Sequence, residues 1–358
     1  MHDKIINLFD LEKFFNKSLP IEIAGYYKSG ARDEITLKKN REIFNSYELL
    51  PKLLRDVTKI DISKNFLGCD LKNPIILAPV AMQQMAHPDG EIAAAKAANT
   101  HGSAMTLSTS SNYSIEDVAG HNENIFFQLY FAKDRTITEN MLKKTKEYGF
   151  KAIVFTADAP QLGTRERDER NNFKMPEHLS LGNFKGSILE KFDDRDGSSM
   201  NMHNEVLFDR SLTFKIIPWV KEVSGLPVLV KGILRPDDAS LCFENDADGI
   251  IISNPGGRQL DTTTPTLKQI EPLRKEIGKD KLLIVDGGIR RGTDILKCIA
   301  LGADAIQIGR PVLWGLNYSG KEGAELVLDI LIKEFIETMI LTGCRNLNEI
   351  TRDLVREA

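Results

Sequence analysis

The stretch ISNPGGRQLD, residues 252–261, has the composition of a wall beside a ligand. Arg258 can clamp an anion through charge-assisted hydrogen bonds, and the paired glycines allow a ligand to approach the backbone closely. Pro255 stands directly before the glycines, without a backbone N–H and without a side-chain atom that could accept a proton. The stretch therefore predicts anion binding and leaves open which acid–base chemistry takes place beside it.

Two further glycine–arginine segments have the composition of a phosphate site. DGGIRRG contains Gly287, Gly288 and Arg290, and IGRP contains Gly309 and Arg310. Glycines let backbone N–H groups come close to an anion, and guanidinium groups add charge-assisted hydrogen bonds. A single pocket of this kind fits a monophosphate better than a pyrophosphate.

Polar residues also end several short apolar runs elsewhere in the chain. They are Ser108, Gln128, Tyr130, Thr156, Asp158, Lys231, Ser253, Asn254 and Asp286. Lys231 and Gln128 could hydrogen-bond a flat heterocycle, and a lysine beside such a ring would stabilise an anionic reduced form. These residues form one site only if the fold brings the ends of the runs together.

Eight apolar runs are the elements that would position these side chains. They are PIILAPVA (74–81), AMTLS (104–108), IFFQLY (125–130), AIVFTAD (152–158), PVLVKG (227–232), DGIIISN (248–254), LLIVDGG (282–288) and AIQIGR (305–310). Near-continuous hydrophobicity is typical of parallel strands buried on both faces, and helical patterns lie between the runs. We predict an α/β fold, a (β/α)8 TIM barrel, whose chemistry sits at the C-terminal ends of its strands.

A doubly wound dinucleotide-binding sheet is the alternative fold. That fold requires GxGxxG after its first strand, whereas the first run here leads into APVAMQQMAHPDG. The glycines gather instead after the seventh and eighth runs, where barrels commonly bind phosphate. The pattern therefore favours the barrel.

Two segments lie outside the strand–helix rhythm. Residues 1–72 have a helical and mixed pattern, and we expect them to form an N-terminal extension that packs on a barrel domain spanning 73–358. A long loop follows the fourth strand, and its polar part, about 176–211, predicts a mobile insert that could act as a lid. The alternative for this insert is a tolerated insertion without a role.

Composition limits the classes of partner and ligand. The 358 residues carry a net charge of −4, with 42% hydrophobic and 27% charged residues, so nucleic acid is not expected as a partner. Four scattered cysteines predict buried reduced thiols, and six histidines without ligand spacing predict no metal site. The N-terminus lacks the apolar core of a signal peptide, and no run reaches the ~18 apolar residues of a membrane span. We predict a cytoplasmic protein.

The motifs together resemble the FMN-dependent 2-hydroxy-acid oxidases and dehydrogenases, the group that includes glycolate oxidase, L-lactate oxidase and flavoprotein-type lactate dehydrogenase. The resemblance runs from about Asp10 to Glu357. It rests on GYYKSGARDE (25–34), LAPVAMQQMAHPDGE (77–91), FFQLY (126–130), TADAPQLGTRERD (156–168), LVKGI (229–233), SNPGGRQLD (253–261), DGGIRRGTD (286–294) and IGRP (308–311). Their shared order and spacing make the resemblance specific.

The resemblance implies FMN as the cofactor and assigns roles to residues of this chain. Those around the flavin ring and ribityl chain are Pro79, Val80, Ala81, Ser108, Gln128, Tyr130, Thr156, Lys231 and Ser253. Those at the ribityl and phosphate positions are Asp286, Gly287, Gly288, Arg290, Gly309 and Arg310. Those that hold the carboxylate and hydroxyl of a small carboxylate substrate are Tyr26, Tyr130, Arg165 and Arg258. Asp158 matches the carboxylate that orients the family's catalytic histidine.

The position of that histidine is occupied by Pro255. Imidazole suits the role of base because its pKa lies near neutrality, and a general base typically contributes ~10²–10⁴ in rate. Asp158, His178 and His203 are the candidates that could replace it. The proline biases Asn254 toward extended backbone, which is compatible with a strand end that runs into a loop. We therefore expect the proline to affect the chemistry more than the structure.

The resemblance predicts an FMN-dependent oxidoreductase that converts a 2-hydroxy carboxylate into the 2-oxo acid, with altered or weak activity. The alternative is a non-catalytic or repurposed protein that binds FMN and a carboxylate. Ser110 stands near a position where some family members carry a bulky aromatic residue, which implies a roomier or more polar substrate pocket. The electron acceptor stays open between oxygen, a quinone and another protein, and the resemblance implies a homotetramer.

Overall fold

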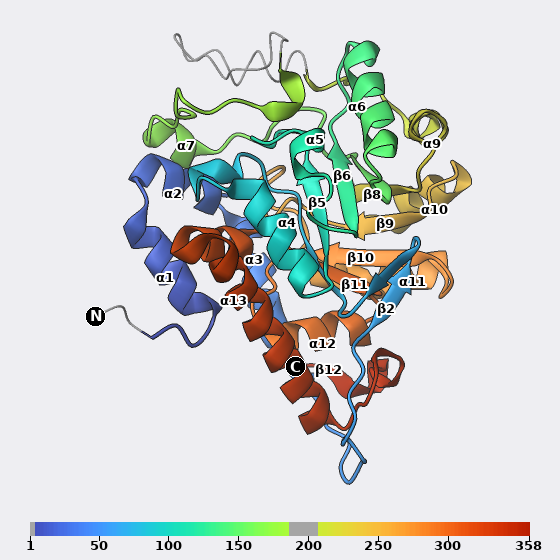
Figure 1. Ribbon diagram of the computed structural model, residues 1–358. Coiled ribbons are helices and arrows are strands. Elements are labelled where there is room, and N and C mark those ends of the chain that lie inside the picture. The colour runs from blue at the N-terminus through green and yellow to red at the C-terminus, as the bar shows by residue number, and fades with distance from the viewer. Residues whose placement is uncertain (1–3, 186–206) are drawn as a thin grey trace.

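A closed barrel of eight parallel strands forms the centre of the molecule in the computed structural model, which describes residues 4–185 and 207–358 (Figure 1). The strands are β4 (Ile75–Leu77), β5 (Ala104–Ser108), β6 (Ile125–Leu129), β7 (Ala152–Thr156), β8 (Val228–Ile233), β9 (Gly249–Ile252), β10 (Leu282–Asp286) and β11 (Ala305–Ile308). They pair in chain order, and β11 closes the barrel against β4. Seven strands lie within predicted runs and β8 extends one residue past its run, to Ile233, so the predicted barrel is confirmed.

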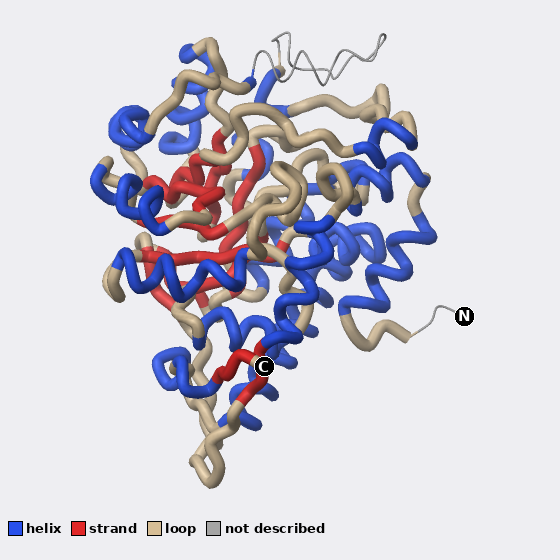
Figure 2. Tube along the Cα trace, turned by 180° about the vertical axis from the view of Figure 1, so that it is seen from behind, coloured by secondary structure: helices blue, strands red, loops and turns tan. Residues whose placement is uncertain are grey.

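Helices surround the strands on all sides (Figure 2). They are α4 (Gly90–Thr100), α5 (Ile115–Val118), α6 (Arg135–Glu147), α7 (Glu166–Arg170), α9 (Ile217–Ser224), α10 (Pro236–Glu244), α11 (Ile270–Ile277), α12 (Gly292–Ala300) and α13 (Arg310–Thr342). Short 3₁₀ turns are η1 (Ile43–Ser46), η2 (Gln83–Met85), η3 (Gly182–Phe184), η4 (Phe214–Ile216), η5 (Thr266–Gln269), η6 (Leu347–Glu349) and η7 (Arg352–Leu354). Helix α13 is kinked at Ser319 and Gly320, whose backbone angles are not helical.

The residues before the barrel pack along its side. They form α1 (Leu8–Ser18), α2 (Ile21–Lys28), α3 (Ile35–Glu42) and β1 (Tyr47–Leu49). Helix α1 begins with a capping box between Asn7 and Asp10, and it lies against α13 (Figure 1). Strand β1 pairs antiparallel with β12 (Val355–Glu357), so the two ends of the chain meet in one small sheet.

A hairpin of β2 (Lys64–Phe66) and β3 (Cys69–Leu71) closes the N-terminal end of the barrel. The ring of Phe66 lies 6.5 Å from that of Phe126, and Cys69 and Leu71 join the apolar cluster inside the barrel. This end of the barrel is therefore a packed apolar core rather than an opening.

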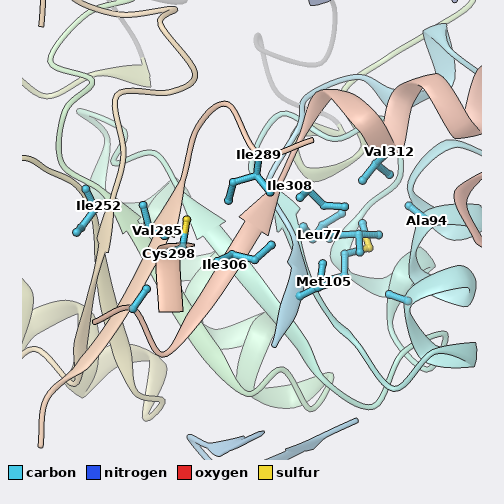
Figure 3. Packing of buried hydrophobic residues seen from close by; sticks show 14 of the residues in the cluster. Leu77, Ala94, Met105, Ile252, Val285, Ile289, Cys298, Ile306, Ile308 and Val312 are labelled. Atoms are coloured by element: carbon cyan, nitrogen blue, oxygen red, sulfur yellow. The ribbon is translucent and has the colours of Figure 1, made fainter. Parts of the chain in front are cut away.

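A second apolar layer lies between the strands and the helices (Figure 3). Ile76 belongs to the cluster inside the barrel, whereas its neighbours Ile75 and Leu77 belong to the outer cluster. This alternation follows from the two-residue period of a strand. Both faces of the strands are thus buried, which explains why the runs are apolar throughout.

The four cysteines, Cys69, Cys242, Cys298 and Cys344, are buried and free, as predicted. Within the described ranges, no helix combines the length and the apolar content that a bilayer crossing requires.

Candidate active site

One cavity opens at the C-terminal ends of the strands, and all but two of the predicted site residues line it. The lining predicted residues are Tyr26, Pro79, Val80, Ala81, Ser108, Gln128, Tyr130, Thr156, Arg165, Lys231, Pro255, Arg258, Asp286, Gly287, Gly288, Arg290, Gly309 and Arg310. The other two, Asp158 and Ser253, lie behind this lining. The closed barrel therefore brings together side chains from its eight strand ends and from α2.

Two arginines face one aromatic ring at the mouth of the cavity. The guanidinium carbon of Arg258 lies 4.9 Å from the centre of the Tyr26 ring, and that of Arg165 lies 5.2 Å from it. Tyr26 stacks on Phe173 with a centroid distance of 4.2 Å. Arg258 also donates to the backbone oxygens of Tyr26 and Ser29, at 2.5 and 3.0 Å. Both cations are thus fixed in place before any ligand binds.

The charge at this mouth favours a carboxylate ligand. Burial, followed by repulsion from Arg165, lowers the pKa of Arg258. Arg165 Nε donates to Asp168 Oδ2 at 2.7 Å and forms an ion pair with it. Arg258, in contrast, has no ion pair in the part of the chain that the structure describes. A bound carboxylate would compensate the buried charge through charge-assisted hydrogen bonds.

Polar side chains form a continuous belt across the ends of β5, β6 and β7. Ser108 Oγ donates to Gln128 Oε1 at 3.1 Å, and Gln128 Nε2 donates to Thr156 Oγ1 at 3.0 Å. The register places Ser108 directly beside Gln128, and Thr156 beside Lys231 on β8. The belt presents donors and acceptors in a row, as the edge of a flat heterocycle requires.

A buried network continues this belt across β8, β9 and β10. Lys231 Nζ donates to Ser253 Oγ at 2.7 Å and lies 3.0 Å from Asp286 Oδ2. Ser253 Oγ donates to the same carboxylate oxygen at 2.9 Å. Asp286 Oδ1 is buried and has no hydrogen-bond partner within residues 4–185 and 207–358. An unsatisfied buried acceptor in a cavity wall fits a ligand hydroxyl, such as those of a ribityl chain.

The glycines after β10 form a close cradle. Gly287 and Gly288 have φ angles of 105° and 77°, in the region that favours glycine. A Cβ atom on Gly288 would lie 1.8 Å from the backbone oxygen of Asn40, so no side chain fits there. Gly309 follows β11 and faces Val80 across the cavity floor. The backbone is therefore open to close approach by an anionic group.

Two half-buried arginines, Arg290 and Arg310, supply positive charge beside this cradle. Arg310 donates to the backbone oxygens of Tyr27, Gly256 and Ser29 at 3.0, 3.0 and 3.1 Å. Burial, followed by repulsion from Arg258 and Arg290, lowers the pKa of Arg310 to about 9, and burial lowers that of Arg290 to about 10. Among the described residues neither guanidinium forms an ion pair with a carboxylate, so the residues fit a phosphate group here.

Pro255 lines the cavity between the arginines and the polar belt, and its backbone is strained. Its φ is 27°, whereas the pyrrolidine ring fixes φ near ~−65°. Such backbone outliers typically cost about 1–3 kcal/mol. The positive φ is a local feature of this loop, and the closed barrel forms around it. That the proline affects the chemistry more than the structure stays a prediction.

The three candidate replacements for the missing imidazole lie in different places. His178 is exposed and does not line the cavity, and His203 lies outside the described residues. Asp158 lies behind the lining, and its Oδ1 is buried without a hydrogen-bond partner in the described part of the chain. Burial raises the pKa of Asp158 to about 7. Ser110 lines the cavity, beside Ser108.

Several residues of the cavity wall were not among those predicted from the sequence. Phe173, Met175, Leu207 and Phe208 come from the two described flanks of the long loop after β7, so part of the loop covers the cavity. The apolar side chains in this otherwise polar loop were the available signal. Gln307 also lines the cavity, with a buried Oε1 that lacks a partner among the described residues. Its signal was a polar residue in the middle of the apolar strand AIQI.

Metal ligands are a separate matter. Across residues 4–185 and 207–358, no three His, Cys, Asp or Glu side chains gather in positions that could hold an ion.

The fold and the cavity define a class of protein, a (β/α)8 barrel whose cavity residues fit a phosphorylated flat heterocycle beside a carboxylate. The chain belongs to the FMN-dependent dehydrogenase family, whose model matches residues 15–357. FMN is its cofactor, and the predicted class, an FMN-dependent 2-hydroxy-acid oxidoreductase, is confirmed at the level of family and cofactor.

Relatives of known name cover nearly the whole chain. Glycolate oxidase 3 of Arabidopsis thaliana is 43% identical over 99% of this chain and 96% of the relative. Glycolate oxidase 1 of Zea mays is 44% identical over 98% of this chain and 95% of the relative.

Solved structures give the same result for the fold. Mandelate oxidase with (S)-4-hydroxymandelic acid superposes with a TM-score of 0.93 at 34% identity, covering 98% of each chain. A soluble mutant of the membrane-associated (S)-mandelate dehydrogenase from Pseudomonas putida gives 0.91 at 34% identity, over 99% of this chain and 100% of the other.

Proposed function

We propose that this protein binds a small 2-hydroxy carboxylate beside FMN and oxidises it to the 2-oxo acid, at a rate lowered by Pro255. The observation that carries this proposal is the pair of arginines on the Tyr26 ring, at 4.9 and 5.2 Å. This pair opens into the cavity that holds the polar belt and the buried cations. Relatives named for glycolate and structures named for mandelate support a 2-hydroxy acid as the substrate.

The residues have separate tasks in this proposal. Gly288, Arg290 and Arg310 hold the phosphate, and the belt from Ser108 to Thr156 holds the edge of the ring. FMN, when bound, supplies the capacity to accept two electrons. Lys231, held by Ser253 and Asp286, stabilises negative charge on the reduced ring.

The substrate itself is oriented by groups that cannot accept a proton. Arg165 and Arg258 bind its carboxylate, and Tyr26 and Tyr130 contact its hydroxyl and side chain. Guanidinium groups offer donors and no acceptor, so they position the acid and do not take its proton. Ser110 widens the wall, which suits side chains larger than that of glycolate.

Anaerobic mixing tests the proposed reaction. The FMN-loaded protein is mixed with glycolate, L-lactate, (S)-mandelate and longer 2-hydroxy acids, and the flavin absorbance is followed. We expect slow, saturable bleaching with at least one acid. Unchanged absorbance with every acid, in protein that binds FMN, would exclude oxidation of 2-hydroxy acids.

A second candidate function is binding without turnover, and Pro255 at the wall of the cavity favours it. A binding protein would perturb the flavin spectrum when a 2-oxo acid such as pyruvate is added, and no 2-hydroxy acid would reduce the flavin. Slow reduction by any acid, dependent on its concentration, would exclude this candidate.

The electron acceptor, the assembly and the location complete the proposal. Photoreduced protein mixed in turn with oxygen, a soluble quinone and an oxidised carrier protein identifies the acceptor by the rate of flavin reoxidation. We also propose that the protein forms a homotetramer, as the family resemblance implies, and that it is located in the cytoplasm. Light scattering of the FMN-loaded protein measures the first, and cell fractionation the second.

A further inference from the structure

Asp158 lies where three cavity-lining elements meet. It follows β7 by two residues, and its carboxyl group packs against Gly232 of β8, where a Cβ atom would lie 2.4 Å from Asp158 Cγ. Its backbone oxygen accepts from Gln259 Nε2 at 2.9 Å, which ties it to the loop that contains Pro255. The residue is thus fixed directly behind the wall of the cavity.

The carboxyl group of Asp158 is available for another partner. Its Oδ1 is buried and has no hydrogen-bond partner in the part of the chain that the structure describes. A buried acceptor that stays unsatisfied is unfavourable and marks a place where a ligand or water binds. Asp286 also has an unpartnered Oδ1, but its Oδ2 accepts from Ser253 and lies 3.0 Å from Lys231 Nζ, so that carboxylate already has a cationic partner.

The other groups around the cavity are poor acceptors for a proton from the substrate. Pro255 has no suitable atom, and Arg165 and Arg258 carry donors only. Burial, followed by the charge of Asp158, raises the pKa of Tyr130 to about 12, so its phenol keeps its own proton. Of the two carboxylates near this wall, Asp286 is paired with Lys231 at 3.0 Å, whereas Asp158 forms no ion pair within the described residues.

We infer that the Asp158 carboxylate takes the proton that the substrate hydroxyl loses, through one intervening water molecule. This inference rests on the proposed function. The O–H bond of the substrate breaks, and its electron pair forms the second carbon–oxygen bond of the 2-oxo acid. The hydrogen on the same carbon leaves with its electron pair to FMN, which is reduced. The hydroxyl proton ends on Asp158, so atoms and electrons balance.

The pH dependence follows from the groups that face Asp158. Burial raises its pKa to about 7, Lys231 of β8 opposes this rise, and Asp286 of β10 adds to it. Tyr130, which follows β6, also faces it. A proton acceptor works in its ionised form, so flavin reduction should accelerate as the pH rises through about 7 and level off above it.

Substitution of Asp158→Asn in the FMN-loaded protein tests the inference. Asparagine keeps the shape and cannot accept a proton, so we expect the flavin reduction rate to fall by ~10²-fold or more and to lose its rise near neutral pH. Asp237→Asn is the matched control, since Asp237 is an exposed carboxylate on α10. It should keep both the rate and the pH profile.

Each outcome decides between the two proposals. If the wild-type flavin is bleached and Asp158→Asn keeps the wild-type rate and pH profile, Asp158 is not the acceptor and the proposed function stands. If no acid bleaches the wild-type flavin, both fail.

Folding of the variant is checked separately. If Asp158→Asn does not bind FMN, the wild-type protein still decides the matter through infrared titration of its protonated carboxyl groups. A band that titrates near pH 7 and shifts when pyruvate binds supports Asp158, and the absence of such a band in the wild-type spectrum overturns it.

Discussion

The two ends of the same barrel are built in opposite ways. The N-terminal end is closed by the β2–β3 hairpin, and its residues, such as Leu71 and Phe126, are apolar and buried. The C-terminal end carries two pairs of arginines, two unsatisfied carboxylate oxygens and a proline with a φ of 27°. The tightly packed N-terminal end can therefore stabilise a C-terminal end that is strained and charged. Mutations at the N-terminal end should mainly change stability, and mutations at the C-terminal end should mainly change ligand binding and rate.

The largest effect is expected from Pro255→His at the open end. An imidazole there would lie at the position that the family resemblance assigns to the base, with Asp158 to orient it. We expect flavin reduction by a 2-hydroxy acid to accelerate by ~10²–10⁴-fold, measured by anaerobic stopped flow. Stability should change far less than rate, and an unchanged rate would mean that more of the pocket differs than residue 255.

Phe126→Ala, at the closed end, should lower the stability strongly and change ligand binding little. Phe126 is fully buried and packs against Phe66, so its truncation leaves a cavity inside the barrel. The free energy of unfolding should fall by about 3–5 kcal/mol in chemical denaturation. The affinity for pyruvate, measured on the folded FMN-loaded variant, should stay close to that of the wild type. A large loss of affinity would show that the two ends are coupled.

Arg258→Lys should weaken carboxylate binding at the open end without destabilising the packed N-terminal end of the barrel. Lysine carries the charge but lacks the planar fork that reaches the backbone oxygens of Tyr26 and Ser29. We expect pyruvate to bind about 10–100-fold more weakly, a cost of about 1.4–2.8 kcal/mol, as read from the perturbation of the flavin spectrum. Arg235→Lys is the control, because Arg235 is exposed on the approach to α10. Equal affinity in Arg258→Lys and wild type would argue against the carboxylate clamp.

Pro255→Gly should give the smallest effect, an increase in stability. Glycine adopts positive φ freely, so the variant relieves strain, although its more flexible unfolded chain offsets part of the gain. We expect a net gain of about 1 kcal/mol in the free energy of unfolding. A loss of stability would mean that the loop accepts the proline without strain.

The sequence was a good guide to the barrel because the signal is carried by many residues. Eight apolar runs each coincided with one strand to within a few residues, and the glycines and arginines that follow the last two runs pointed to the correct end of the barrel. Strand limits were less accurate. The sequence predicted Ser253 and Asn254 as part of a strand that in the structure ends at Ile252. Local hydrophobicity does not reveal where backbone pairing ends.

Features that depend on distant parts of the chain could not be predicted. The hairpin of β2 and β3 has only three residues in each strand, so its sequence has no clear period. Phe173 and Phe208 reach the cavity from opposite flanks of a long loop, and only the folded chain brings them to one wall. The φ of Pro255 contradicts the local preference of proline, so the surroundings must impose it.

Those surroundings fix the loop around residue 255 independently of its side chain. Gly257 N donates to Asn254 O at 2.8 Å, Ala31 N donates to Gly257 O at 2.8 Å, and Arg310 Nη1 donates to Gly256 O at 3.0 Å. The scaffold therefore keeps one shape while the residue it presents to the cavity can change. Histidine and proline codons can differ in a single base, so one point mutation in the gene is enough to exchange an imidazole for a pyrrolidine here, or to reverse that exchange. We expect such an exchange to change the rate of the chemistry and to leave the hydrogen bonds of the loop in place.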